Sequence, residues 1–335
     1  MLKTAEFVSL GHPDKTADFI SSYILDRLIE QDEHVKYAVE VMIKENTVVL
    51  GGEICGNVHI DCISQYVQDA LRCIGYNERY HQIWGNNAVD VSNIKVINLI
   101  FCQSAEIFQG VENGGWGDQG IFAGYACQGE DFMPQELYLA KKLNKALYTK
   151  ALSSDNLGLD IKTQITLDEK GTVQTAVVAV PMLKTEDLTS FVEKTLLQKP
   201  EKLIINGTGA YSCHGPIADC GITGRKLACD FYALACPVGG GSPWAKDATK
   251  ADVSLNILAR RLAVQNLHDN NEAFVYLSSC IGKSALPSAM LKTIKNGVVS
   301  WQPLKGDFSP QTVIKTLGLN KPVFADLCSA GITAL

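Results

Sequence analysis

The stretch from Val35 to Ile54, VKYAVEVMIKENTVVLGGEI, predicts a β-hairpin. Val35 to Ile43 and Thr47 to Ile54 are rich in β-branched residues, and the polar Lys44-Glu45-Asn46 segment between them is typical of a turn. Helical spacing of apolar residues flanks the hairpin on both sides, from Ile20 to Glu30 and from Val58 to Ile74.

The same order of helix, hairpin and helix recurs later in the chain. The predicted elements there are a helix over Leu137–Ala151, strands over Ile161–Leu167 and Val173–Val180, and a helix over Leu188–Leu197. Further predictions are strands over Val91–Phe101, Lys202–Ile205 and Ala273–Ser278, a helix over Val253–Leu267 and a less regular tail. Strand pairs alternating with helices favour an α/β (α+β) architecture, and the recurrence indicates an internal repeat that residue identity alone does not prove.

The composition is that of a globular protein. The 335 residues include 46% hydrophobic residues and carry a net charge of −6, which excludes a disordered chain and argues against general binding to nucleic acid or a membrane surface. We expect no signal peptide, and no apolar run approaches the ~20 residues that span a bilayer. The eleven cysteines have irregular spacing without a C-x-x-C pair, which favours free thiols in the cytoplasm.

Four loops combine glycine with charged residues. They are Gly11–Lys15 (GHPDK), Gly114–Gly120 (GGWGDQG), Asp219–Lys226 (DCGITGRK) and Gly239–Asp252 (GGGSPWAKDATKAD). Each has a plain structural alternative: a proline-initiated helix, a surface loop, a solvated turn and a linker before a helix, respectively. Together they repeat one pattern of Asp with Lys or Arg, which favours a nucleoside triphosphate with Mg²⁺. Walker A, G-x-S-x-G and H-E-x-x-H motifs do not occur in the sequence.

Taken in order, these segments resemble the S-adenosylmethionine synthetase (methionine adenosyltransferase) family. The matching motifs are Val8–Lys15 with Ala17-Asp18, Gly51–Ile54, Gln103-Ser104 with Gln109–Val111, Gly117–Gly120 with Gly124–Ala126, Asp160–Gln164, Asp219–Lys226, and Gly239–Gly241 with Lys246-Asp247 and Lys250. The resemblance implies three structurally similar α/β subdomains with pseudo-threefold symmetry, which we place approximately at residues 1–105, 106–206 and 207–335, with the chain free to interleave between them. It also implies a homodimer with shared active sites, which many members pair into homotetramers.

The reaction implied by the resemblance joins ATP and L-methionine. The methionine sulfur attacks C5′ of the ribose, and the triphosphate leaves and is hydrolysed to pyrophosphate and phosphate. A thioether needs no general base, so catalysis depends on positioning and on neutralising the anionic leaving group. Two Mg²⁺ ions per site and K⁺ are the implied cofactors.

The resemblance also assigns roles to individual residues. The implied catalytic residues are His12, Lys15, Lys162, Arg225 and Lys246. The implied ATP-binding residues are His12, Lys15, Asp160, Lys162, Asp219, Arg225, Lys226, Ser242 and Lys246. The implied methionine-binding residues are Glu53, Gln103, Asp118, Asp219, Lys250 and Ile281. Asp14 and Asp252 would hold Mg²⁺, and Glu40 would hold K⁺.

The chain departs from the family pattern at several positions. Leu10 replaces the usual Glu, Trp116 interrupts the usual G-A-G-D, and Ser242–Ala245 (SPWA) replaces A-F-S-G. Asn206–Ala210 lacks the family's Pro and following Arg, and the Gln103–Gly117 loop and the C-terminus are short. These changes leave open a homologue acting on another thioether or methionine analogue, and a non-catalytic ATP-binding paralogue. A bare Mg²⁺-dependent polyphosphate hydrolase would fit the charges but would leave Glu53, Gln103 and Lys250 without a role.

Overall fold

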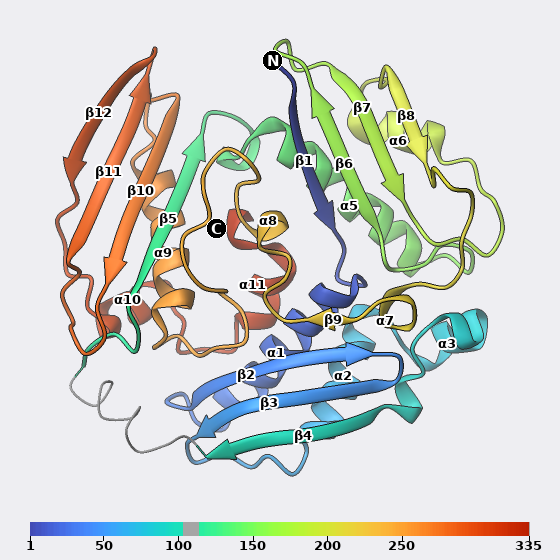
Figure 1. Cartoon of the computed structure of the whole chain (residues 1–335), viewed down its shortest axis with the longest axis horizontal. Coiled ribbons are helices and arrows are strands. Elements are labelled where there is room, and N and C mark those ends of the chain that lie inside the picture. The colour runs from blue at the N-terminus through green and yellow to red at the C-terminus, as the bar shows by residue number, and fades with distance from the viewer. Residues whose placement is uncertain (103–113, 335) are drawn as a thin grey trace.

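The computed structural model describes residues 1–102 and 114–334 and contains three four-stranded sheets (Figure 1). The first sheet has the order β9-β2-β3-β4. The hairpin of β2 and β3 lies at its centre, β9 pairs antiparallel to β2, and β4 pairs parallel to β3. The strands are β2 (Lys36–Lys44), β3 (Thr47–Cys55), β4 (Lys95–Cys102) and β9 (Gly221–Ile222).

The second sheet, β1-β6-β7-β8, repeats this topology. A single strand pairs antiparallel to a central hairpin, and the fourth strand pairs parallel to the hairpin's second strand. The third sheet, β5-β10-β11-β12, has the same order but is antiparallel throughout. The strands are β1 (Lys3–Val8), β6 (Lys162–Leu167), β7 (Val173–Ala179), β8 (Lys202–Ile205), β5 (Gly120–Cys127), β10 (Glu272–Ser279), β11 (Ser288–Lys295) and β12 (Val298–Pro303).

A long helix precedes each central hairpin: α1 (Pro13–Ile29), α5 (Gln135–Leu152) and α9 (Ala251–Gln265). Each long helix packs against its own sheet: α1 against β2 and β9, α5 against β1 and β6, and α9 against β5 and β10 (Figure 1). The shorter helices are α2 (Ile63–Ile74), α3 (Glu78–Trp84), α6 (Thr189–Leu196), α7 (Gly215–Ala218), α8 (Leu227–Asp230), α10 (Pro310–Leu317) and α11 (Phe324–Ala330). The recurrence predicted from the sequence is thus visible as one strand order used three times, with the fourth strand parallel in two sheets and antiparallel in the third.

The structure confirms both predicted hairpins and corrects several boundaries. The first helix begins at Pro13 rather than Ile20, and the second begins at Ile63 rather than Val58. The tail after Ser278 is not irregular, because it forms the β11–β12 hairpin and two helices. The division into subdomains at residues 105 and 206 stays a prediction, and each sheet takes one strand from a distant part of the chain. Within residues 1–102 and 114–334, none of the helices has the length and apolar character needed to cross a membrane.

Candidate functional site

Two of the four predicted charged loops, Gly11–Lys15 and Asp219–Lys226, meet at the start of α1. His12 caps this helix, and its Nδ1 accepts a hydrogen bond from the backbone N–H of Asp14 at 3.1 Å. Pro13 occupies the first helical position, where its missing N–H and fixed φ are favourable. The proline-initiated helix considered as the plain alternative is therefore present. It does not account for the buried carboxylate of Asp14, which is only 1% exposed.

The Asp219–Lys226 loop supplies the partners of Asp14. Oδ1 of Asp14 accepts a hydrogen bond from the Ile222 N–H at 2.9 Å and lies 3.6 Å from Nε of Arg225. Oδ2 of Asp14 accepts a hydrogen bond from Nζ of Lys226 at 2.7 Å. Burial opposes ionisation of Asp14, but the hydrogen bonds from Lys226 and Ile222 outweigh it and lower the pKa of the carboxyl. Gly221 permits this approach, because an added Cβ would lie 2.0 Å from the carbonyl oxygen of Pro13.

His12 is uncharged in this setting. Burial, together with the positive charges of Lys226 and Lys162, lowers the pKa of its imidazole to about 3. Because Nδ1 accepts a hydrogen bond, the single proton of the neutral ring is assigned to Nε2. His12 therefore offers a neutral N–H donor beside two lysines and an arginine, an arrangement suited to phosphate oxygens.

Asp160 and Lys162 lie beside this cluster. The Val8↔Lys162 register of β1 and β6 brings Lys162 near the start of α1. Oδ2 of Asp160 accepts from the Gly215 N–H at 3.1 Å, and Oδ1 is buried without a hydrogen-bond partner among the described residues. Burial raises the pKa of Asp160 to about 6, against the opposing charge of Lys162. A buried polar oxygen without a partner is costly and suits a site that a polar ligand completes.

A second carboxylate and lysine pair lies at the start of α9. Nζ of Lys246 donates to Oδ2 of Asp252 at 2.5 Å, in the first turn of the helix. Gly241 has a φ of 73°, and a Cβ there would lie 2.1 Å from Cγ of Asp252, so glycine is required on both grounds. Ser242 follows directly, and its Oγ accepts from the Trp244 N–H at 3.2 Å.

Lys15 is buried, whereas a side chain that lines a triphosphate is expected to be exposed. Its Nζ is buried, 2.7 Å from Oδ1 of Asp230 and 3.2 Å from Oδ2 of Asp18. Burial opposes its charge, but Asp230 outweighs it and the pKa of Lys15 is raised. Lys15 is therefore held in a buried ion pair, and its predicted contact with the triphosphate stays a prediction.

The predicted methionine-binding residues are dispersed in a single chain. Asp118 and Ile281 lie close together, since the Asp118 carbonyl accepts from Oγ of Ser279, and Trp116 bridges to Ile281. Lys250 is the N-cap residue of α9. Asp219 is exposed just before β9, and Glu53 lies on β3 of the same sheet. Gln103 lies outside the described residues.

The potassium candidate Glu40 lies on β2, where Oγ1 of Thr223 donates to its Oε2. Within the described part of the chain, no group of three or more His, Cys, Asp or Glu side chains gathers as a ready-made metal cage. Mg²⁺ commonly uses one or two carboxylates together with substrate phosphates, so Asp14 and Asp252 fit this manner of binding without such a cage.

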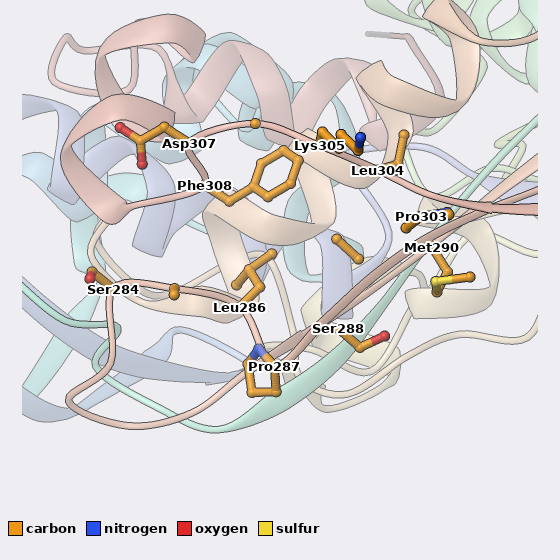
Figure 2. Close-up of a pocket in the computed structure, with 13 residues that line it drawn as sticks. Ser284, Leu286, Pro287, Ser288, Met290, Pro303, Leu304, Lys305, Asp307 and Phe308 are labelled. Carbon is orange, nitrogen blue, oxygen red and sulfur yellow. The ribbon is translucent and has the colours of Figure 1, made fainter.

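A cavity elsewhere in the protein does not share this chemistry. It has a volume of about 590 Å³ and lies between the Ser284–Ser288 segment and the Leu304–Phe308 segment (Figure 2). Lys305 and Asp307 are the charged residues among its lining, and none of the predicted site residues contributes to it. The converging charges at α1 and α9 are the stronger candidate for an anionic substrate.

The sequence reasoning missed a buried histidine behind Asp160. Nδ1 of His214 donates to the Ser212 carbonyl at 2.6 Å, and Nε2 pairs with the Tyr80 hydroxyl at 2.6 Å. That hydroxyl also accepts from the Leu159 N–H, next to Asp160. Burial lowers the pKa of His214 to about 4. The sequence carries no signal for this histidine, because its partner Tyr80 lies 134 residues away along the chain.

We expect His214 to make stability depend on pH. Because its folded-state pKa is lowered from 6.5, its contribution is present above pH 6.5 and is lost as the pH falls towards 4. The advantage in unfolding free energy of the wild type over His214→Asn should shrink by about 2 kcal/mol between pH 7.5 and 5.0. Urea unfolding at both pH values measures this change. His34→Asn, at an exposed histidine, is the control, and an equal change in both variants would contradict the assignment.

The fold and the site together define an α/β protein in which cationic side chains gather around buried carboxylates, an arrangement suited to an anionic substrate. Matches to the N-terminal, central and C-terminal domains of S-adenosylmethionine synthetase cover residues 1–105, 113–211 and 213–334. The chain therefore belongs to the S-adenosylmethionine synthetase family.

Individual relatives agree. The chain is 33% identical to S-adenosylmethionine synthase 2 of Rhodospirillum rubrum, with 98% of the chain and 91% of the relative covered. It is 34% identical to S-adenosylmethionine synthase of Paramagnetospirillum magneticum, with coverages of 98% and 92%. The solved structure of an unusual S-adenosylmethionine synthetase from Campylobacter jejuni matches with a TM-score of 0.89 and 30% identity, over 100% of the chain and 95% of that structure.

Proposed function

We propose that the protein is a methionine adenosyltransferase that forms S-adenosylmethionine from ATP and L-methionine. The observation that carries the proposal is the convergence of His12, Asp14, Lys162, Arg225 and Lys226 at one helix start in a member of this family. The sulfur attacks C5′ of the ribose, the C5′–O bond breaks, and the electron pair leaves with the triphosphate. This chemistry requires donors for the departing oxygens and no base for the nucleophile.

The residues fit distinct parts of this task. Nε2–H of neutral His12 would donate to a phosphate oxygen. Lys226 and Lys246 would hold the triphosphate. Their ammonium groups lie beside Asp14 and Asp252, respectively, which are the two predicted Mg²⁺ ligands. Asp14 and Asp252 would hold Mg²⁺, which supplies charge neutralisation when bound, and Glu40 would hold K⁺. Hydrolysis of the triphosphate to pyrophosphate and phosphate belongs to the same proposal.

One incubation tests the function. Purified protein with ATP, L-methionine, Mg²⁺ and K⁺ should form S-adenosylmethionine with equal amounts of pyrophosphate and phosphate, read by mass spectrometry and phosphate assay. Phosphate without the sulfonium product would instead support a hydrolase or another thioether acceptor. Binding of ATP with no product would support a non-catalytic paralogue. The family membership favours neither alternative.

The assembly is proposed from the outer face of the first sheet. The registers of β2, β3 and β4 place Met42, Val49, Ile97, Leu99 and Phe101 on one face. Leu99 is 50% and Phe101 is 72% exposed in the single chain, and apolar side chains gathered in this way mark protein interfaces. The predicted methionine-binding residues are dispersed in a single chain, and a homodimer would allow two chains to complete one site. A cytoplasmic location is proposed from the irregularly spaced cysteines.

We expect Leu99→Glu combined with Phe101→Glu to separate the dimer. Four charges introduced across a twofold interface are desolvated and repel each other. Size-exclusion chromatography with light scattering should give the wild type as a dimer or tetramer and the variant as a monomer. Leu152→Glu, at an exposed leucine at the end of α5, is the control. A monomeric wild type would refute the proposed assembly.

A further inference from the structure

We propose that Trp244 is a positioning residue that holds the loop bearing Ser242 and Lys246 in its site-forming conformation. The proposal rests on the proposed function for the role of Lys246, but the anchoring of the loop can be tested without it. The segment is one of the positions where the chain departs from the family pattern, with Ser242-Pro243-Trp244-Ala245 after the three glycines.

Trp244 points into the protein interior, whereas its neighbours Ser242 and Lys246 belong to the predicted site. Its side chain is 2% exposed, and its Nε1–H donates to Oδ2 of Asp230 at 2.8 Å. Nζ of Lys15 lies 4.9 Å from the centroid of the indole ring and 2.7 Å from Oδ1 of the same aspartate. A cation over an indole face and a hydrogen bond to a carboxylate are both strengthened by burial.

This anchor joins the segments that make up the candidate site. Lys15 and Asp18 belong to α1, which also presents His12 and Asp14. Oδ1 of Asp18 accepts from the Gly224 N–H at 2.8 Å, in the loop that bears Arg225 and Lys226. A Cβ on Gly224 would lie 3.2 Å from Cβ of Ser242. The indole therefore connects the Gly239–Asp252 loop to the Gly11–Lys15 and Asp219–Lys226 loops, which surround Asp14.

The backbone directly after Trp244 adopts an unfavourable conformation that the buried indole stabilises. Ala245 has a φ of 71°, a left-handed conformation that costs free energy in a residue with a Cβ. The Ala245 carbonyl accepts a hydrogen bond from the Val39 N–H at 3.0 Å. The backbone of Lys246 then forms an isolated antiparallel β-bridge with Ala38. This reversal carries the chain from the buried indole to the Lys246 ammonium beside Asp252 within two residues.

The test uses Trp244→Phe, which keeps an aromatic ring and removes the N–H donor. Hydrogen exchange should be faster in the peptide covering residues 239–249. The kcat for S-adenosylmethionine should fall about ten- to a hundredfold, because small displacements of a positioning group have effects of this size. The KM for methionine should change by less than about twofold, since the contact is not made to methionine.

Ala245→Gly in the Trp244→Phe background provides the rescue. Glycine adopts the left-handed conformation freely, so kcat should recover by at least about threefold and the exchange should slow. A general loss of packing would not respond to a glycine at this position. Trp84→Phe is the matched control, because Trp84 is also 2% exposed and its Nε1 has no hydrogen-bond partner among the described residues.

Exchange and turnover equal to the wild type in Trp244→Phe would overturn the proposal, as would a double variant that behaves no better than Trp244→Phe. If the wild type itself forms no S-adenosylmethionine, the proposed function fails. In that case the exchange of residues 239–249 in the three variants still decides whether Trp244 anchors the loop.

Discussion

Asp252→Asn is expected to lower the rate of S-adenosylmethionine formation by about 10²–10³-fold, the usual effect of removing one group that stabilises developing charge. The carboxylate lies in the first turn of α9 and accepts from Lys246. An amide of the same shape keeps the packing against Gly241 but removes the charge that would hold Mg²⁺ and fix the ammonium.

The rate is measured by mass spectrometry of the product at saturating ATP, methionine and Mg²⁺, and the thermal midpoint checks the fold. Asp269→Asn is the matched control, because Asp269 also pairs with a lysine, Lys295, but at the surface. Its rate should equal that of the wild type. Activity of Asp252→Asn within about threefold of the wild type would remove Asp252 from the predicted site.

Lys15→Met is expected to destabilise the protein by about 3–5 kcal/mol, the effect of breaking a buried ion pair by removing one partner. The substitution leaves Asp18 and Asp230 buried without their cation. Burial and the charge of Asp230 already raise the pKa of Asp18 to about 7 even though Lys15 opposes them.

Urea unfolding measures the free energy of unfolding at pH 7.5. Arg79→Ala is the control, since the Arg79–Asp155 pair is exposed and such pairs contribute little. A stable Lys15→Met protein that binds ATP poorly would favour the role implied by the family resemblance, in which Lys15 lines the triphosphate. A strongly destabilised protein would support the structural role inferred from its burial.

The sequence predicted the parts of the fold in which local pattern and packing agree. The β2–β3 and β6–β7 hairpins were predictable because their strands alternate and are joined by polar turns. The strand β12 was not, because all six of its residues are exposed and no alternation results, although the Asn296-Gly297 turn before it is a strong hairpin signal. The apolar pattern predicts the first helix only from Ile20, because the residues of its first turn are charged yet buried, and a helix starting at Pro13 was only the plain alternative for the Gly11–Lys15 loop.

The candidate site was predictable in composition but not in geometry. Asp14, Arg225 and Lys226 were selected by residue type, and the structure brings them together. The inward orientation of Lys15 could not be foreseen, because its partner Asp230 is 215 residues away along the chain. Residue type indicates which groups can bind phosphate, and only the packing decides which of them face it.

The interleaved sheets have a consequence for how the protein folds as it is synthesised. Strand β1 is the first to leave the ribosome, yet its partner β6 lies far along the chain: Thr4 pairs with Thr166, 162 residues later. At ~5–20 residues per second, β1 waits roughly ten to thirty seconds for that partner. The sheet of β2–β4 likewise lacks β9, and β5 lacks β10, until still later. We therefore expect nascent chains to keep unpaired strand edges through most of translation, and to depend on chaperones during that interval.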